Sequence, residues 1–279
     1  MITDREADAL SAHLTEIAID AAREAGTYIV QHAGRVEEVG EKRGFFDPVT
    51  ECDRHSERLI SAQIFRRHPD STIIGEEGGQ QGNGAVHWYV DPIDGTNNFV
   101  AGLPYYCVSI AAALDDRMLA GVIYDPEHDE CFTAARAGVT LNGAPIRAKG
   151  AAGDTGATLL TGFPKSGGQA TADDLDRFSV LLKSFRATRR LGSTALHLAY
   201  VACGRSDVTF EINTNSWDLA AGMFLVQQAG GQYLVPETEA VFATRPWLSG
   251  SFIAACPEFS VEQSSLRPAI WEGLIVPAR

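Results

Sequence analysis

The chain has 279 residues, and its composition and charge already exclude several classes of protein. A hydrophobic content of 45% with 21% charged residues is typical of a globular protein and excludes a disordered one. A formal net charge of −13 argues against a nucleic-acid-binding surface, which would need a basic stripe.

The cysteines and the N-terminal segment indicate a cytoplasmic protein. The five cysteines are scattered without a CxxC pair, as expected for reduced thiols in a cytosol. The first residues are acidic and lack the apolar segment of a signal peptide. No stretch approaches the roughly 20 apolar residues that a membrane span requires. We therefore expect a cytoplasmic protein with no membrane partner.

The N-terminal part of the chain predicts two helices and a short strand. Apolar residues at helical spacing predict the first helix over 5–33. A polar loop follows, and Thr50 then starts a second helix that runs to about Arg67. Residues 71–74 predict a short strand that leads directly into an acidic, glycine-rich segment.

The middle of the chain predicts a series of strands. The apolar run 87–90 indicates a buried strand that ends at Val90, because Pro92 cannot donate a ladder hydrogen bond. Short turns separate the strands that follow, so we expect an antiparallel meander. The meander strands are 107–114, 118–124 and 130–134, and a hairpin-type turn follows at 141–144.

The segment 149–156 is rich in small residues and is the candidate boundary between two lobes. Beyond it, strands over 158–161, 208–212 and 252–255 alternate with helices over 173–185, 193–202 and 217–229. This pattern predicts a mixed α and β protein in which helices cover sheets. We expect one catalytic unit over 1–279, with an antiparallel-sheet lobe over about 1–148 and an α/β lobe over about 157–279.

The most informative motif is Asp91-Pro92-Ile93-Asp94-Gly95-Thr96, which brings two carboxylates close together. Two carboxylates about 4 Å apart repel each other by roughly 4 kcal/mol at an effective dielectric constant of ~20. Either one carboxylate takes up a proton or a cation lies between them. Ligands that are all oxygen favour Mg²⁺, Mn²⁺ or Ca²⁺ over zinc. Taken alone, the motif could equally be an ordinary polar turn.

Three further acidic clusters favour the metal interpretation. Glu76 and Glu77 follow a strand and lie between glycines, although such a pair is also typical of a solvated loop tip. Asp53 lies three residues after Thr50, as in a capping box, but its helical face also carries isoleucines and so points inward. Asp218 begins an apolar helix with no Lys or Arg nearby in sequence, so a shared metal is expected to balance its charge.

A short helix that begins near Thr96 would point its free N–H groups at an incoming anion. In a metal-assisted phosphoester hydrolase, N–H groups of this kind hold the phosphate, and metal ions and a hydroxyl lie beside it. The motif offers each of these parts. The sequence lacks both a P-loop and a serine-nucleophile elbow.

In chain order, these motifs resemble those of the inositol monophosphatase family, and the resemblance covers most of the chain. The resemblance implies a layered α-β-α-β-α sandwich of the inositol monophosphatase and fructose-1,6-bisphosphatase type. It also implies Mg²⁺-dependent hydrolysis of a phosphate monoester, inhibition by Li⁺ and a homodimer. The matching segments are Lys42 through Asp53, Gly75-Glu76-Glu77, Asp91 through Phe99 with Pro104, and Trp217 through Gly222 ending in Ala229-Gly230-Gly231.

The resemblance implies a set of metal ligands. One ion would be held by Glu76, Asp91 and the carbonyl of Ile93, and a second by Asp91, Asp94 and Asp218. A third and weaker ion would lie near Glu76. We expect two or three Mg²⁺ ions, with Mn²⁺ as a possible substitute and Ca²⁺ and Li⁺ as inhibitors.

The resemblance also implies catalytic and substrate-binding roles. Thr96, oriented by Asp53, would position a metal-activated water with Glu77 nearby, and the N–H groups of Gly95 and Thr96 would hold the phosphate. The residues implied for the substrate side are Glu211, Ser193 and Thr194, and Lys42 would belong to a mobile loop.

Two positions bear on the alcohol half of the substrate. Asn215-Ser216 stands where some inositol-specific members have His-Cys, so the resemblance does not specify which alcohol the substrate carries. Asn97 resembles inositol phosphatases rather than relatives that cleave nucleotide bisphosphates, which tend to have a lysine there.

The first expectation is therefore hydrolysis of a small polyol or sugar phosphate, with myo-inositol 1-phosphate as the first substrate to test. The alternatives are fructose-1,6-bisphosphatase activity and hydrolysis of histidinol phosphate or a nucleotide bisphosphate. The second phosphate of a fructose bisphosphate would need a basic contact from Arg189, Arg190 or Lys165. A different class of function would be a regulatory or binding protein that keeps the fold. The negative charge argues against RNA as its partner.

Overall fold

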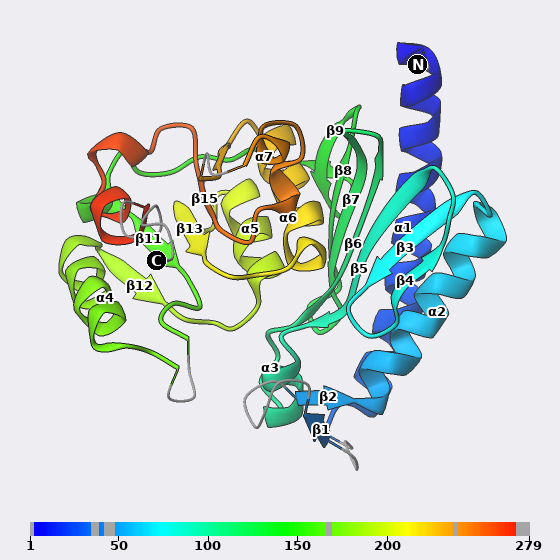
Figure 1. The fold of residues 1–279 in the computed structure, drawn as a ribbon, viewed down its shortest axis with the longest axis horizontal. Helices are drawn as coiled ribbons and strands as arrows, with labels where there is room; N and C mark the ends of the chain where they lie inside the picture. Colours follow the sequence, from blue (N-terminus) through cyan, green and yellow to red (C-terminus); the bar gives the residue numbers. More distant parts are fainter. Residues whose placement is uncertain (1–2, 35–38, 42–47, 166–168, 237–238, 272–279) are drawn as a thin grey trace.

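The computed structural model describes residues 3–34, 39–41, 48–165, 169–236 and 239–271. The described chain forms alternating layers of helix and sheet (Figure 1). Two helices cover the outer face of a large sheet, two lie between that sheet and a smaller one, and one covers the far face of the smaller sheet. In that order the helices are α1 (Asp4–His32) with α2 (Glu51–Arg67), α5 (Thr194–Ala202) with α6 (Ser216–Gln228), and α4 (Ala172–Ser184).

The larger sheet is mostly antiparallel. Within the described residues its strand order is β10-β9-β8-β7-β6-β5-β3-β4, and only the pairing of β3 with β5 is parallel. The order confirms the predicted meander of β6, β7 and β8. The strands are β3 (Ser71–Gly75), β4 (Gly79–Gly82), β5 (Val86–Asp94), β6 (Cys107–Leu114), β7 (Arg117–Asp125), β8 (Glu130–Ala135), β9 (Gly138–Leu141) and β10 (Ala144–Pro145).

The smaller sheet is mixed. Its order within the described residues is β12-β11-β13-β15-β14, with β11 parallel to both of its neighbours. Its strands are β11 (Thr158–Leu160), β12 (Ala187–Arg189), β13 (Val208–Glu211), β14 (Gln232–Leu234) and β15 (Phe252–Ala255). The larger sheet ends at Pro145 and the smaller begins at Thr158. The division of the chain into two lobes itself stays a prediction.

The remaining elements are short. A pair of strands precedes α2, a short helix follows β5, and single helical turns connect the later strands. They are β1 (Val39–Glu41), β2 (Pro48–Thr50), α3 (Thr96–Ala101), α7 (Val241–Thr244), η1 (Asp154–Gly156), η2 (Pro246–Leu248), η3 (Val261–Gln263) and η4 (Arg267–Trp271). Among the described residues, every helix is too short or too polar to traverse a bilayer.

Two apolar cores hold the layers together. The first lies between α1, α2 and the larger sheet and includes Leu14, Ile60 and Trp88, which are fully buried. The second fills the space around α5 and α6 and includes Leu198 and Leu225. Helix α6 is buried nearly all round from Leu219 to Val226, as its apolar sequence predicts, and Asp218 lies in its partly exposed first turn.

Strand β5 continues through Pro92 to Asp94, so the prediction that this strand ends at Val90 is wrong. Its pairing with β6 is regular as far as Asp91 and shifts before Asp94, which marks a bulge. Pro92 lies inside this bulge, where the ladder is interrupted and an N–H donor is not needed. The bulge keeps both aspartates on the strand while changing the direction of the chain before α3.

Candidate active site

Three aspartates from distant segments meet at the centre of the molecule. Asp91 and Asp94 lie in the last part of β5, and Asp218 lies in the first turn of α6. Each offers a carboxylate oxygen, and these oxygens all lie within 4.8 Å of one another. The structure therefore brings together the three residues that the sequence analysis assigned to one ion.

Burial and mutual repulsion make this cluster unfavourable when all three groups are charged. Burial raises the pKa of Asp91 well above its usual value, and the charges of Glu76, Asp94 and Asp218 raise it further. Burial likewise raises the pKa of Asp218 well above its usual value, with the charges of Asp94 and Glu76 adding to the effect. Oxygen donors at this spacing, with charge to be neutralised, fit a divalent cation such as Mg²⁺.

Asp94 is also tied to α5 on the opposite side of the cluster. Its Oδ2 accepts hydrogen bonds from Ser193 Oγ at 2.7 Å and from the N–H of Ala195 at 2.6 Å. Burial raises the pKa of Asp94, while these two hydrogen bonds favour the charged form. Ser193 additionally caps α5 by accepting the N–H of Leu196 at 3.3 Å. One carboxylate thus connects the end of β5 to the start of α5.

Thr96 is held beside the cluster by Asp53. Thr96 Oγ1 lies 3.1 Å from Asp53 Oδ1 and 3.0 Å from the carbonyl oxygen of Ile93. The other oxygen of Asp53 accepts both the N–H and the hydroxyl of Thr50, at 2.8 and 2.5 Å. Both interpretations of Asp53 are therefore correct: it completes the capping box of α2, and it is a fully buried partner of Thr96.

Gly95 gives the chain its turn between β5 and α3. Its φ is +104°, a conformation that side chains with a Cβ rarely adopt. A Cβ at this position would also lie 3.0 Å from the carbonyl oxygen of Tyr105 and 3.3 Å from that of Gly192. The helix predicted near Thr96 is present, and its first residue is Thr96 itself.

Glu76 and Glu77 lie in the turn between β3 and β4. The N–H of Glu76 donates to the carbonyl of Val90 at 3.1 Å, which anchors the turn to β5. The influence of Glu76 on the pKa of Asp91 shows that its carboxylate belongs electrostatically to the same cluster. Both glutamates are partly exposed and border a cavity.

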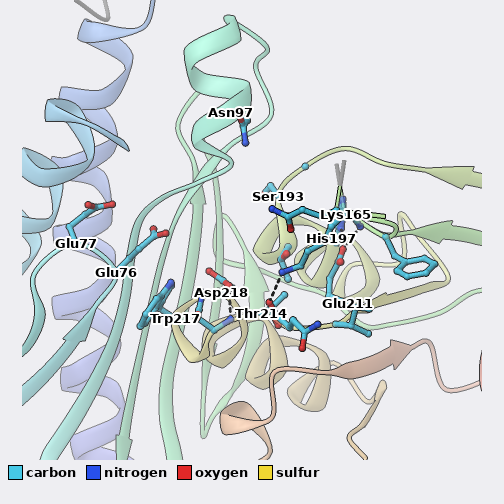
Figure 2. A pocket seen from close by; sticks show the side chains of 18 residues that line it. Glu76, Glu77, Asn97, Lys165, Ser193, His197, Glu211, Thr214, Trp217 and Asp218 are labelled. Carbon is cyan, nitrogen blue, oxygen red and sulfur yellow. Dashed lines mark hydrogen bonds and ion pairs between the residues drawn. The ribbon is translucent and has the colours of Figure 1, made fainter. Parts of the chain in front are cut away.

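The cavity has a volume of about 710 Å³, within the range of small-molecule sites. Figure 2 shows Glu76 and Glu77 on one side of it, Asn97 above, Asp218 and Trp217 at its floor, and Ser193, His197 and Glu211 on the opposite side. Thr194 also lines it. Asp91 and Asp94 are buried and do not belong to its lining.

The side of the cavity opposite the glutamates carries the residues predicted to contact substrate. Glu211 is nearly buried, and its Oε1 accepts the N–H of Gly162. The same oxygen lies 3.5 Å from Nδ1 of His197. His197 is 1% exposed, and neither ring nitrogen has a hydrogen-bond partner among the residues that the structure describes.

Sequence reasoning missed His197 and Asn98. His197 is a polar residue on an otherwise apolar helix, a signal that was present in the sequence. Asn98 Nδ2 donates to the carbonyls of Tyr105 and Leu191 at 2.7 Å each, so it joins α3 to the segment before α5. No local pattern indicates this bridge, because its partner lies 93 residues away.

The basic residues proposed for a second phosphate occupy different places. Lys165 lines the cavity, and its Nζ donates to the carbonyl of Asn213 at 3.3 Å. Arg190 donates to the carbonyls of Gly162 and Pro164. Neither Arg190 nor Arg189 is part of the cavity lining. Lys42, predicted to belong to a mobile loop, lies outside the described residues.

The chain matches the model of the inositol monophosphatase family over residues 11–272. It is 43% identical over 218 residues to a protein named Nus factor SuhB from Xylella fastidiosa, covering 77% of this chain and 79% of that protein.

Two solved structures are similar over most of their length. The extragenic suppressor protein suhB of Bartonella henselae has a TM-score of 0.79 and 32% identity, covering 88% of this chain and 94% of that one. An IMPase of Thermotoga maritima has a TM-score of 0.75 and 35% identity, covering 86% and 91%. These similarities confirm the predicted layered sandwich fold. The match over nearly the whole sequence, together with the acidic cluster at its centre, shows that the chain belongs to the inositol monophosphatase family.

Proposed function

We propose that the chain is a Mg²⁺-dependent phosphatase that hydrolyses a small polyol or sugar phosphate, with myo-inositol 1-phosphate as the first candidate substrate. The observation that carries the proposal is the meeting of Asp91, Asp94 and Asp218 within 4.8 Å, beside a cavity of small-molecule size. Family membership and the similarity to a Thermotoga maritima IMPase support the same activity.

The acidic residues would act as cation ligands. Glu76, Asp91 and the carbonyl of Ile93 would hold one ion, and Asp91, Asp94 and Asp218 a second. A bound Mg²⁺ would lower the pKa of a coordinated water and neutralise charge on the phosphoryl oxygens. The raised pKa values of Asp91 and Asp218 support this assignment, because a cation relieves the repulsion that raises them.

Thr96 would orient the attacking water. Its hydroxyl has one hydrogen, and both nearby protein atoms, Asp53 Oδ1 and the Ile93 carbonyl oxygen, are acceptors. The hydrogen is therefore committed to one of them, and a lone pair of Oγ1 is left to accept a hydrogen from water. Glu77, on the same side of the cavity as Glu76, would be a second acceptor for that water. The N–H groups of Gly95 and Thr96 would hold the phosphate.

The opposite wall of the cavity would receive the alcohol. Glu211 presents a carboxylate that can accept hydrogen bonds from substrate hydroxyls, with Ser193 and Thr194 beside it. Acceptors of this kind favour an alcohol with several hydroxyls over an apolar one. This supports a polyol or sugar as the leaving group.

The test is release of inorganic phosphate from a panel of inositol, sugar, histidinol and nucleotide phosphates, with Mg²⁺ and with a chelator. We expect turnover of inositol 1-phosphate that disappears when the metal is removed and returns when Mg²⁺ is added. Absence of turnover on every member of the panel would contradict the proposal.

Fructose 1,6-bisphosphate is the second candidate substrate, and the location of Lys165 supports it. Lys165 lines the cavity and offers a positive charge for a second phosphate. Kinetics on both substrates, with wild-type protein and Lys165→Ala, separate the two cases. A selective loss for the bisphosphate in the variant would favour the second substrate, and equal kinetics in both proteins would argue against it.

A regulatory role is the candidate from another class, and the names of the relatives favour it. Proteins named Nus factor SuhB are 43% and 41% identical to this chain in Xylella fastidiosa and Escherichia coli. A name of this kind denotes a factor rather than an enzyme, so a macromolecular partner is proposed alongside the phosphatase activity. In-cell replacement by a hydrolysis-deficient variant tests it: full rescue of a deletion phenotype would favour the factor role.

A further inference from the structure

Glu57 is a buried carboxylate that the proposed chemistry does not use. It lies on α2, one helical turn after Asp53, and it is 3% exposed. Its Oε2 accepts the N–H of Glu77 and its Oε1 accepts the N–H of Gly78, each at 2.7 Å. The side chain therefore reaches from the helix to the turn between β3 and β4 and holds its backbone with both oxygens.

Two glycines leave room for this carboxylate. A Cβ on Gly75 would lie 2.6 Å from the carboxylate of Glu57, and a Cβ on Gly78 would lie 2.6 Å from its Oε1. Neither glycine has a positive φ, so backbone conformation does not explain them. From the sequence, glycines on both sides of the glutamates are expected to let the backbone bend tightly. The structure shows that Gly75 and Gly78 also allow the close approach of the Glu57 carboxylate.

The contacts of Glu57 fix the backbone on the C-terminal side of Glu76. The N–H of Glu76 is bound to Val90 on β5, and the next two N–H groups are bound to Glu57. Three consecutive N–H groups are thus committed, and they fix the backbone from which the Glu76 side chain projects. Hydrogen bonds to a charged acceptor are about twice as strong as neutral ones, so this is a firm anchor.

We propose that Glu57 is a positioning residue that presents the carboxylate of Glu76 to a divalent cation. Helix α2 would then position two parts of the site. Asp53 binds the hydroxyl of Thr96, and Glu57 binds the backbone of the turn that carries Glu76. The inference rests on the proposed function, because it assigns Glu76 as a cation ligand. Residues that orient ligands in this way typically change metal affinity by 10–100-fold when they are substituted.

The experiment measures Mn²⁺ and Mg²⁺ binding by titration calorimetry, without substrate, for wild type, Glu57→Gln and Glu51→Gln. The amide of Glu57→Gln keeps the size of the side chain but turns one acceptor into a donor that faces a backbone N–H. We expect binding about 10–100-fold weaker in Glu57→Gln. Glu51, on the same helix, is exposed and paired with Arg58, so Glu51→Gln is a matched control that retains wild-type affinity.

Phosphatase assays give a second readout. Because Glu57 holds the backbone of the Glu76 turn and does not line the substrate side of the cavity, we expect Glu57→Gln to need about 10–100-fold more Mg²⁺ for half-maximal rate, while its KM for substrate at saturating Mg²⁺ is unchanged. A general loss of structure would not raise the Mg²⁺ requirement alone, because it would also lower activity at saturating Mg²⁺. A folded Glu57→Gln with wild-type cation affinity overturns the inference.

Gly78→Ala provides an independent test if Glu57→Gln does not fold. The added methyl group would displace the carboxylate while leaving its charge in place. Weaker cation binding supports the inference, and unchanged affinity overturns it. A wild-type protein that binds neither Mg²⁺ nor Mn²⁺ overturns both this inference and the proposed function, whereas equal binding by wild type and variants removes only the role of Glu57.

Discussion

Asp94 joins two parts of the site, the acidic cluster and the start of α5. It shares the acidic cluster with Asp91 and Asp218, and it accepts hydrogen bonds from Ser193 and Ala195 at the start of α5. An asparagine at this position keeps an oxygen that can accept those hydrogen bonds, but it carries no charge. Substitution therefore separates the electrostatic contribution of Asp94 from its contribution to packing.

We expect Asp94→Asn to lose activity by about 10² or more while remaining folded, because a neutral ligand supports a divalent cation poorly. Phosphate release at saturating Mg²⁺ and the thermal melting curve give the two measurements. Asp116→Asn is a suitable control, since Asp116 is half-exposed and pairs with Arg245 away from the cluster. A near-wild-type rate for Asp94→Asn would instead favour a role that does not depend on hydrolysis.

The hydroxyl of Thr96 is the second residue whose chemistry can be isolated. Thr96→Val keeps the shape of the side chain and removes the oxygen that Asp53 and Ile93 orient. We expect kcat to fall by about 10²-fold, because the attacking water loses the oxygen that orients it. Thr96→Ser restores the oxygen and is expected to recover most of the rate. Equal kcat values for the valine and serine variants would show that the hydroxyl has no part in the reaction.

At the scale of elements, the position of α6 against the larger sheet decides where Asp218 lies. The helix approaches β7 closely at Gly121, where an added Cβ would lie 3.0 Å from the carbonyl oxygen of Ala221. Ala221 follows Asp218 by one helical turn. Residues 220–222 are alanine, alanine and glycine, and their small size allows the helix and the strand to approach at backbone distance.

We expect Gly121→Ala to destabilise the protein by about 1–3 kcal/mol, as overpacking of a tight contact does. Because α6 would shift from β7, cation affinity should fall together with stability. Chemical denaturation and metal titration measure the two effects. Gly153→Ala is the control, since a Cβ there meets no atom within 4 Å. Lowered stability with unchanged cation affinity would show that α6 moves without carrying Asp218.

At the scale of the whole molecule, the acidic cluster makes folding and cation binding depend on pH. The pKa values of Asp91 and Asp218 are raised in the folded chain, whereas an unfolded aspartate titrates near about 3.9. Between that pH and the raised values, the folded metal-free chain keeps protons that the unfolded chain has lost. The contribution of Asp91 and Asp218 to the stability of the metal-free chain is therefore largest at low pH. It falls as the pH rises from the pKa of an unfolded aspartate to the raised pKa values of the folded chain.

A bound Mg²⁺, as proposed here, would reverse this dependence, because it would require the charged carboxylates and remove their repulsion. We expect the increase in melting temperature caused by Mg²⁺ to grow as pH is raised from about 5 to 8. Thermal melting with chelator, and with Mg²⁺ at matched ionic strength, measures the increase at each pH. An increase that shrinks over this range would contradict the raised pKa values.

The sequence predicted most of the elements because their signals are local. Helices α1 and α2 and the meander strands appear within a few residues of their predicted bounds, since apolar spacing and capping residues specify them directly. The extension of β5 past Pro92 was missed, because a proline excludes a regular ladder but not a bulge. The contacts of Glu57 and Asn98 join distant segments, and no pattern near those residues indicates them. His197 is different, because a polar residue on an apolar helix is a signal that the sequence does contain.

The two uses of Asp53 have a consequence for protein engineering. One oxygen of this carboxylate closes the first turn of α2, and the other holds Thr96. If variants were selected only for heat resistance, Asp53 would be retained because it caps α2, even in variants that had lost Thr96. Survival at high temperature would then say nothing about the proposed hydrolysis, so any stabilised variant of this protein would have to be screened for both properties at once.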